Sequence, residues 1–333
     1  MRRTLSAAAT VLAALVAFAM PAAATTACRG QDLLPRLSAE QPALHQEILA
    51  AAATTPNGDA LLWRVEKPGV PPSWLYGTIH LTDDRLTTFK PPVTAALQSA
   101  RVVALEVADL SREALARAMG RSAQLLLDPS GGIDKVLSGD ELQVARRVLE
   151  EAGLPYHVLG MVRPWFVYTL LAVPACERAR AAAGLKSVDS RIADLAKSRG
   201  TPVVGLESIE DQLRAMAGIP ADEQAKLLKA SVAMADRTED LTETLISLYL
   251  QERIDLVWPL NLALARTVNV SSDSFRGFTS TVLIGRNYKM RDALLPLLAE
   301  GGVFAGVGAL HLVGTEGLVS LVRQAGYTVT AVR

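Results

Sequence analysis

The chain has 333 residues, of which 50% are hydrophobic and 20% are charged, a composition typical of folded globular proteins and not of disordered ones. Its 34 basic residues balance its 34 acidic residues, so the formal net charge is zero at pH 7. This balance argues against a polyanionic partner, and we expect no binding to nucleic acid.

The N-terminal segment has the pattern of a secretory signal peptide. Arg2 and Arg3 precede an apolar run at residues 7–20, and the small residues at 22–24 offer a cleavage site. The apolar run is shorter than the roughly 20 residues that a membrane helix needs. We therefore predict cleavage near Ala24, a periplasmic or secreted mature protein, and no stable membrane insertion. An uncleaved anchor is the alternative.

The two cysteines, Cys28 and Cys176, are expected to pair. An even number of cysteines in an exported protein favours a disulfide, which here would tie the N-terminal tail and helix, residues 25–60, to the rest of the chain. A lipid-modified Cys28 and two free thiols are the alternatives. Neither cysteine has a partner at the short spacing of zinc sites, so we expect no structural zinc.

The order of apolar and helical patterns predicts an α/β fold. A helical pattern at residues 39–53 precedes apolar runs at 61–67 and 73–79, and the Pro- and Gly-rich residues 68–72 between those runs indicate a hairpin turn. Further buried strands are predicted at residues 102–107, 202–206, 303–307 and 328–332. Helical periodicity marks residues 142–152, 190–199, 221–252, 287–299 and 315–325.

Strands separated mostly by helices, with one hairpin, predict a central mixed β-sheet flanked by helices. We expect residues 61–333 to form a single α/β domain with a helical insertion around 220–270. Residues 221–252 contain no proline, so they are interpreted as one long helix that could form a lid or a wall over a site.

Two predicted strands end in the same motif, Gly-x-x-His. One spans Gly77 to His80, the other spans Gly308 to His311, and Glu106 ends a third predicted strand. Ligands bind at the carboxyl ends of strands in open α/β sheets, so we predict that these side chains meet at one edge. Imidazole and carboxylate are ordinary ligands for zinc, manganese, cobalt or iron, and they also serve as acid and base.

Structural roles are the alternatives for the same residues. A histidine at a strand end is often a hydrogen-bonded, half-buried residue, and Glu106 could form an ion pair with an arginine such as Arg286. For His45, on a predicted helix, and His157, in a predicted loop, we favour structural roles.

Six strings of the sequence carry a resemblance to the TraB/PrgY/GumN family, which includes the Tiki proteins. They are WLYGTIHL, VVALEV, MVRPW, VVGLESIEDQL, IGRNYKM and VGALHLVGTEGLVSLVRQAGYTV, in this order from about residue 61 to the C-terminus. The resemblance implies a Tiki-like and erythromycin-esterase-like fold, and a site built from both Gly-x-x-His motifs and a glutamate. The bacterial GumN-type branch is the most similar part of the family.

Carried onto this chain, the resemblance implies a divalent metal held by His80, His311 and Glu106, with manganese or cobalt as in Tiki proteins, or zinc or iron. Glu106 could instead be the base that activates water, and Arg286 and Glu207 are further catalytic candidates. Arg286 could hold a substrate carboxylate or an oxyanion. Asp83 is a weaker candidate, and Gln212 and Trp165 are expected to serve packing or orientation.

The leading functional hypothesis is a periplasmic metal-dependent hydrolase that resembles a peptidase and acts on a peptide or small polar substrate. The alternative is a non-catalytic protein that binds and sequesters a peptide or glycan. An accessory factor of exopolysaccharide production is a third hypothesis, suggested only by the GumN name.

Overall fold

The computed structural model describes residues 27–128, 132–151 and 160–333. The predicted signal peptide and its cleavage point, and His157, lie outside these residues. Within them, no helix combines the length and the apolar character that a membrane crossing requires.

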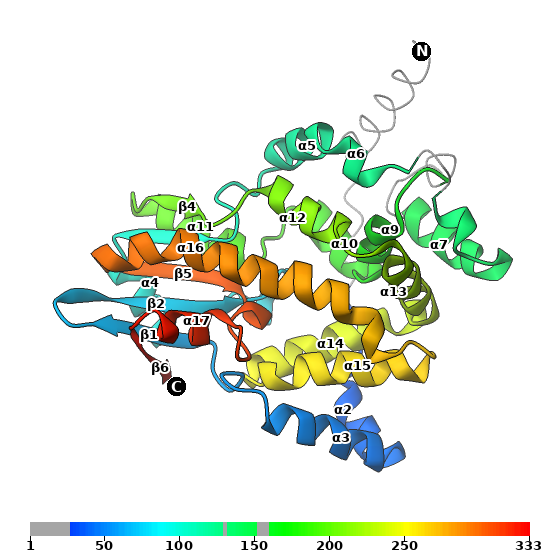
Figure 1. Ribbon diagram of the computed structural model, residues 1–333, viewed down its shortest axis with the longest axis horizontal. Coiled ribbons are helices and arrows are strands. Elements are labelled where there is room, and N and C mark those ends of the chain that lie inside the picture. The colour runs from blue at the N-terminus through cyan, green and yellow to red at the C-terminus, as the bar shows by residue number, and fades with distance from the viewer. Residues whose placement is uncertain (1–26, 129–131, 152–159) are drawn as a thin grey trace, which may run out of the picture.

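Within the described residues, six strands form one mixed sheet in the order β4-β3-β5-β2-β1-β6 (Figure 1). The strands are β1 Leu62–Lys67, β2 Val70–Thr78, β3 Val102–Leu105, β4 Val203–Gly205, β5 Val303–Gly308 and β6 Thr328–Val332. β1 pairs antiparallel with β2 and β6, whereas the β2–β5, β5–β3 and β3–β4 pairs are parallel. The predicted α/β class and its mixed sheet are confirmed.

The hairpin turn is shorter than predicted. The strand β2 already begins at Val70, so Pro71 and Pro72 lie inside it, where the pairing with β1 shifts register between Val65 and Lys67. Proline is tolerated at such an irregularity because no regular ladder hydrogen bond from its nitrogen is needed there.

Helices fill the connections between the strands. They are α2 Leu33–Glu40, α3 Pro42–Ala53, α4 Pro91–Ser99, α5 Arg112–Arg121, α6 Ala123–Leu126, α7 Gly139–Glu151, α9 Pro164–Leu171, α10 Ala175–Ala182, α11 Val188–Ser198, α12 Ile209–Ala217, α13 Ala221–Ala233, α14 Thr238–Leu250, α15 Val257–Thr267, α16 Gly285–Glu300 and α17 Leu318–Gln324. The single helix predicted at residues 39–53 is broken at Pro42, which begins α3.

The prediction of one long helix over residues 221–252 is wrong. It is divided into α13 and α14 by a 3₁₀ turn, η3 (Ala235–Arg237). The division has a packing reason, because Leu228 of α13 joins a core of helices while Leu248 of α14 joins the core against the sheet. A straight helix of this length would extend about 48 Å and could not cover both cores.

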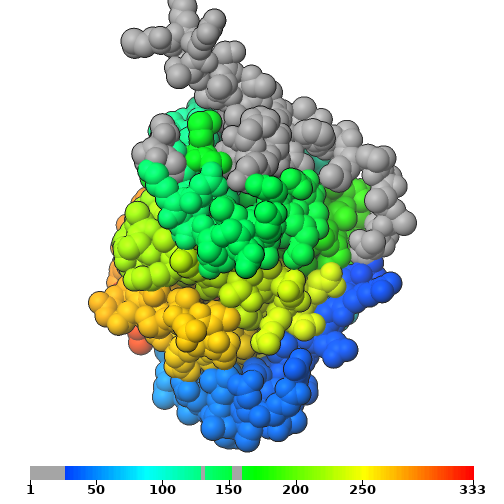
Figure 2. Space-filling model, turned by 90° about the vertical axis from the view of Figure 1, so that its right-hand side faces the viewer, coloured from blue at the N-terminus to red at the C-terminus, as the bar shows by residue number. Residues whose placement is uncertain are grey.

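The centre of the sheet is buried on both faces, which explains why β3 and β5 are continuous apolar runs. Phe304 and Leu105 face a core shared with α4, α11, α14 and α15, whereas Leu75 and Val303 face a core shared with α16 and α17. A separate helical core, formed mainly by α7, α9 and α13, lies beyond the carboxyl ends of the parallel strands (Figure 1). Figure 2 views that helical half from its outer end, with α2 and α3 below it.

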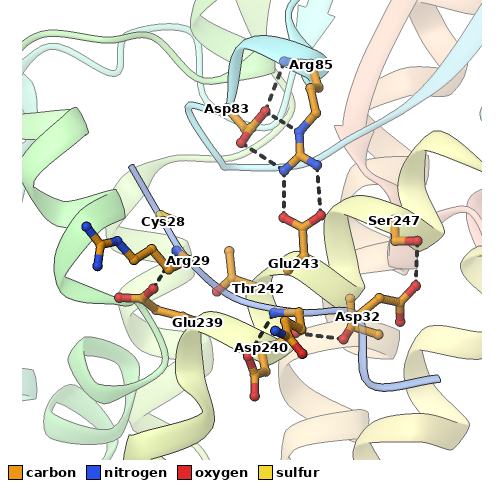
Figure 3. Close-up of polar contacts among 12 residues, drawn as sticks. Cys28, Arg29, Asp32, Asp83, Arg85, Glu239, Asp240, Thr242, Glu243 and Ser247 are labelled. Atoms are coloured by element: carbon orange, nitrogen blue, oxygen red, sulfur yellow. Dashed lines mark hydrogen bonds and ion pairs between the residues drawn. The ribbon is translucent and has the colours of Figure 1, made fainter. Parts of the chain in front are cut away.

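The predicted disulfide between Cys28 and Cys176 is present and joins the N-terminal segment to α10. The segment then crosses α14 as a strap (Figure 3). The backbone N–H groups of Arg29 and Gln31 donate to Glu239 and Asp240 at 2.7 and 2.8 Å. The N-terminal segment is therefore fixed by one covalent bond and by carboxylates of α14.

Candidate functional site

The parallel pairing of β2 and β5 brings the two Gly-x-x-His motifs side by side. Thr78 lies opposite Gly308 in the register, so both motifs leave the sheet at the same edge. A Cβ atom added to Gly77 would lie 3.0 Å from the Cβ of Ala309, which shows how closely the two turns pack. Glycine is needed at Gly77 for this close approach, because any side chain would push the turns apart.

Three candidate side chains converge over Gly308. A Cβ atom built on this glycine would lie 3.1 Å from Glu106 Oε1, 3.5 Å from His311 Cδ2 and 3.8 Å from His80 Nε2. The absence of a side chain at Gly308 thus leaves a small space that both imidazoles and the carboxylate border. The structure brings together the residues that the sequence placed at three separate strand ends.

The His80 ring is held by an acidic residue from α11. Its Nδ1 lies 2.8 Å from Asp189 Oδ2, and Thr78 donates a hydrogen bond of 2.6 Å to Asp189 Oδ1. The negative charge of the Asp189 carboxylate raises the pKa of His80 to about 9. Although 61% of the side chain is exposed to solvent, the short contact keeps its imidazolium form favoured at neutral pH.

The His311 ring has a neutral partner. Its Nδ1 lies 2.6 Å from Asn287 Oδ1, and the Asn287 amide donates from Nδ2 to the carbonyl of Glu316 at 2.8 Å. That second bond orients the amide, so Nδ1 of His311 carries the proton and Nε2 carries a lone pair. Burial lowers the pKa of His311 to about 4, so its ring is neutral at neutral pH.

Glu106 is anchored by its surroundings. Its Oε1 accepts the Gly308 N–H at 2.7 Å, and its Oε2 accepts bonds from Arg286 Nη2 at 2.5 Å and Gln212 Nε2 at 3.0 Å. Burial alone would raise the pKa of Glu106, but the positive charges of His311, His80 and Arg286 hold it at about 2. Both imidazoles are protonated in the acidic range where Glu106 titrates, so His311 contributes positive charge there although its ring is neutral at pH 7. With a pKa of about 2, Glu106 is an anion at neutral pH.

The sequence profile of the TraB/PrgY/gumN family matches residues 61–331 of the chain. The chain belongs to this family. No curated protein and no solved structure matches the chain. Both Gly-x-x-His turns and Glu106 lie within the part of the chain that the TraB/PrgY/gumN profile covers.

In this TraB/PrgY/gumN member, Arg286 sits between two carboxylates. Its Nε donates to Glu207 Oε1 and Oε2 at 3.0 and 3.1 Å, its Nη2 contacts Glu106 and Glu207, and its Nη1 donates to the Val282 carbonyl. The ion pair that we considered as the alternative role of Glu106 is therefore present. With its guanidinium engaged on each side, Arg286 supports Glu106 and offers a substrate little of the bidentate contact that we predicted.

The expected metal ligands do not form a complete set. Among the residues that the structure describes, no group of three or more His, Cys, Asp or Glu side chains is placed to hold a metal ion. Positive charge next to Glu106 gives a chemical reason, because Arg286 bonds to its Oε2 and the imidazolium form of His80 has no lone pair for an ion. His311 Nε2 stands 3.9 Å from Glu106 Oε1, so the two groups form no hydrogen bond with each other.

Other predicted residues have structural surroundings. Asp83 pairs with Arg85 and Arg180, and the indole of Trp165 donates to the Leu125 carbonyl inside the helical core. Gln212 bridges Glu106 and Glu207, consistent with the expected orienting role.

Asp189 is the site residue that sequence reasoning missed. Its place in the helical pattern could have identified it, because Asp189 shares the buried face of α11 with Ile192, Ala193 and Ala196. An acidic residue on an otherwise apolar helix face must find a buried partner. Asn287, the partner of His311, follows the candidate residue Arg286 in the IGRNYKM string, and the family resemblance implies both residues.

Proposed function

We propose that this protein is a hydrolase that cleaves an amide or ester bond by acid–base catalysis, with a peptide as the first substrate to test. One observation carries the proposal: two imidazoles face the same space over Gly308, and at neutral pH the His80 ring is a cation whereas the His311 ring is neutral. Two titratable groups whose environments separate their pKa values are the usual arrangement of an acid and a base.

The charge states assign the roles. The Nε2 lone pair of neutral His311 accepts a proton from water while the water oxygen bonds to the carbonyl carbon. His80 donates its Nε2 proton to the leaving nitrogen or oxygen as that bond to carbon breaks. Proton exchange with solvent then restores both rings. Asp189 and Asn287 are positioning residues in this scheme, since each holds an Nδ1 atom and directs the opposite nitrogen into the site.

Glu106 supplies a fixed negative charge next to both rings. Its anion stabilises the proton that His311 gains during attack, and Arg286 and Glu207 keep the carboxylate in place. Glu106, Arg286 and Glu207 thus act in the proposal through the histidines and not directly on the substrate.

A hydrolase that uses divalent manganese, cobalt, zinc or iron is the second form of the proposal. The observation that favours it is that each ring nitrogen Nδ1 is held by a partner, an arrangement that metal-binding histidines commonly share. The positive charge of Arg286, which bonds to Glu106 Oε2, speaks against it because that charge opposes a second cation at the same carboxylate.

The first experiment compares the mature protein with His80→Gln and His311→Gln on a panel of peptides and esters, before and after chelator treatment. We expect each variant to lose about 100-fold or more in kcat/KM. His45→Gln, the same change on α3 away from the site, should keep full activity. The metal-dependent form of the proposal would replace the metal-free form under two conditions. The purified protein would contain near-stoichiometric metal that is absent from the His80→Gln, His311→Gln double variant, and chelation would abolish its activity.

The pH dependence tests the assignment of roles. The base must be deprotonated and the acid protonated, so kcat/KM should rise through about pH 4, where His311 loses its proton, and fall through about pH 9, where His80 loses its own. Ligand binding without turnover, unaffected by Glu106→Gln, would instead support the sequestering protein.

A further inference from the structure

A cavity of about 320 Å³ lies among α9, α13, α14 and α15, next to the second Gly-x-x-His turn. Leu310, the residue before His311, forms part of its wall. Phe278 forms another part and begins a π-helical segment, η6 (Phe278–Ile284), that leads directly into α16 with Arg286 and Asn287. The cavity and the candidate site therefore share these two segments of the chain.

The wall of the cavity is apolar and rich in aromatic rings. Trp258 stacks on Phe278 with ring centroids 5.6 Å apart and meets Phe275 edge-on at 5.8 Å. Leu310, Trp258 and Phe278 are only half-buried although they are large and apolar. Half-buried apolar side chains around an unfilled cavity are typical of ligand sites, in which the ligand completes the burial.

The polar side chains of the wall are mostly committed to their own helices. Ser231, Thr238 and Thr242 each donate to a backbone carbonyl of the same or the preceding turn. Tyr168 differs, because only 7% of it is exposed and its hydroxyl has no hydrogen-bond partner among the described residues. This oxygen is also closed to water, so Tyr168 contributes its ring and not its hydroxyl to the cavity wall.

We propose that this cavity binds an extended apolar group attached to the carbonyl that is cleaved. The inference rests on the proposed hydrolase function and adds the substrate class to it. The volume is at the lower end of the range of about 300–1,000 Å³ found for ligand pockets, which suits one long acyl chain or one large side chain. Both sources present the same chemistry, so the experiment has an arm for each.

The first measurement is a series of 4-nitrophenyl esters from acetyl to decanoyl, beside peptides that carry alanine, leucine or tryptophan before the cleaved bond. We expect kcat/KM to rise about fourfold for each added methylene until the cavity is filled. A rise in the ester series alone identifies an acyl substrate, and a rise in the peptide series alone identifies an apolar peptide. Activity that is equal for acetyl and decanoyl esters and for alanine and tryptophan peptides overturns the inference but leaves the hydrolase proposal intact.

The second measurement does not depend on turnover. Binding of the neutral probe octanamide is followed by calorimetry in the His80→Gln, His311→Gln double variant. Ala172→Trp adds bulk to an exposed residue of the cavity wall at the end of α9 and should weaken octanamide binding at least tenfold. Ala183→Trp is the matched control, because Ala183 is an exposed residue at the equivalent end of α10 and is not part of the wall.

No octanamide binding to the folded double variant would refute the cavity proposal even if the protein hydrolyses short esters. If octanamide binds but the wild-type protein hydrolyses none of the esters and peptides, the cavity proposal is upheld and the hydrolase proposal is refuted.

Discussion

The two Gly-x-x-His turns have the same motif and lie side by side, yet they place their histidines in opposite environments. His80, in the first turn, is largely exposed and contacts the carboxylate of Asp189. His311, in the second turn, is buried and contacts the amide of Asn287. The comparison teaches that the motif determines the position of each histidine, whereas the neighbouring charges and the burial of the ring determine its protonation state.

The loop that follows the first turn is held by α10 and α14, whereas the second turn rests on another helix. The N–H of Thr82 donates to Glu177 at 2.6 Å, and Glu177 follows the disulfide residue Cys176 on α10. The loop after His80 is further linked to α14 through Arg85 and Glu243 (Figure 3). The second turn instead rests on α16, so the two turns should respond differently to damage.

The largest expected effect follows from removal of the disulfide. The cysteines are 148 residues apart, so Cys28→Ser with Cys176→Ser should lower the free energy of unfolding by about 5 kcal/mol. Urea denaturation measures the loss. NMR signals of His80 should shift more than those of His311, because only the first turn rests on α10. Equal shifts of both rings would contradict the proposed difference in support.

Acid should destabilise the second turn. The pKa of His311 is about 4 in the folded protein and near its ordinary value of 6.5 when unfolded, so the unfolded chain binds the proton first as pH falls. Stability is therefore lost between pH 6.5 and 4, by about 3 kcal/mol from this residue. Denaturation of wild type and His311→Gln at pH 7 and pH 4 measures it. Identical losses in both proteins would show that His311 titrates normally.

Asn287→Asp should make the second turn resemble the first. A carboxylate at Nδ1 raises the pKa of His311, so that both rings become cations and the base is lost at neutral pH. We expect the pKa to rise in an NMR titration and kcat/KM to fall about 100-fold. Asn269→Asp, the same change at an exposed residue outside the site, is the control and should alter neither quantity.

Asp189→Asn should make the first turn resemble the second. Without the carboxylate the pKa of His80 falls from about 9 toward its ordinary value near 6.5, so the acid is deprotonated at pH 8. Activity at pH 8 should fall about 30-fold while activity at pH 6 changes little. Asp194→Asn, on an exposed part of the same helix, should leave the pH profile unchanged. An unaltered alkaline limb in Asp189→Asn would remove His80 from the role of acid.

Much of the fold could be predicted because its central strands β3 and β5 are buried on both faces and its turn residues are distinctive. Each predicted strand is present in the sheet, and the disulfide pairs the only two cysteines. The division between α13 and α14 could not be predicted, since no proline or glycine marks it. It follows from the position of two separate cores, which is a property of the folded chain.

By itself, the sequence determined that His80, Glu106 and His311 end three strands, because apolar runs and their polar ends are local patterns. Only the tertiary structure decided what these residues can do. Asp189 lies 109 positions from His80, and Arg286 lies 180 positions from Glu106, so neither pair is visible in any local pattern. Charge and protonation depend on atoms a few ångströms away, and those neighbours exist only once the chain has folded.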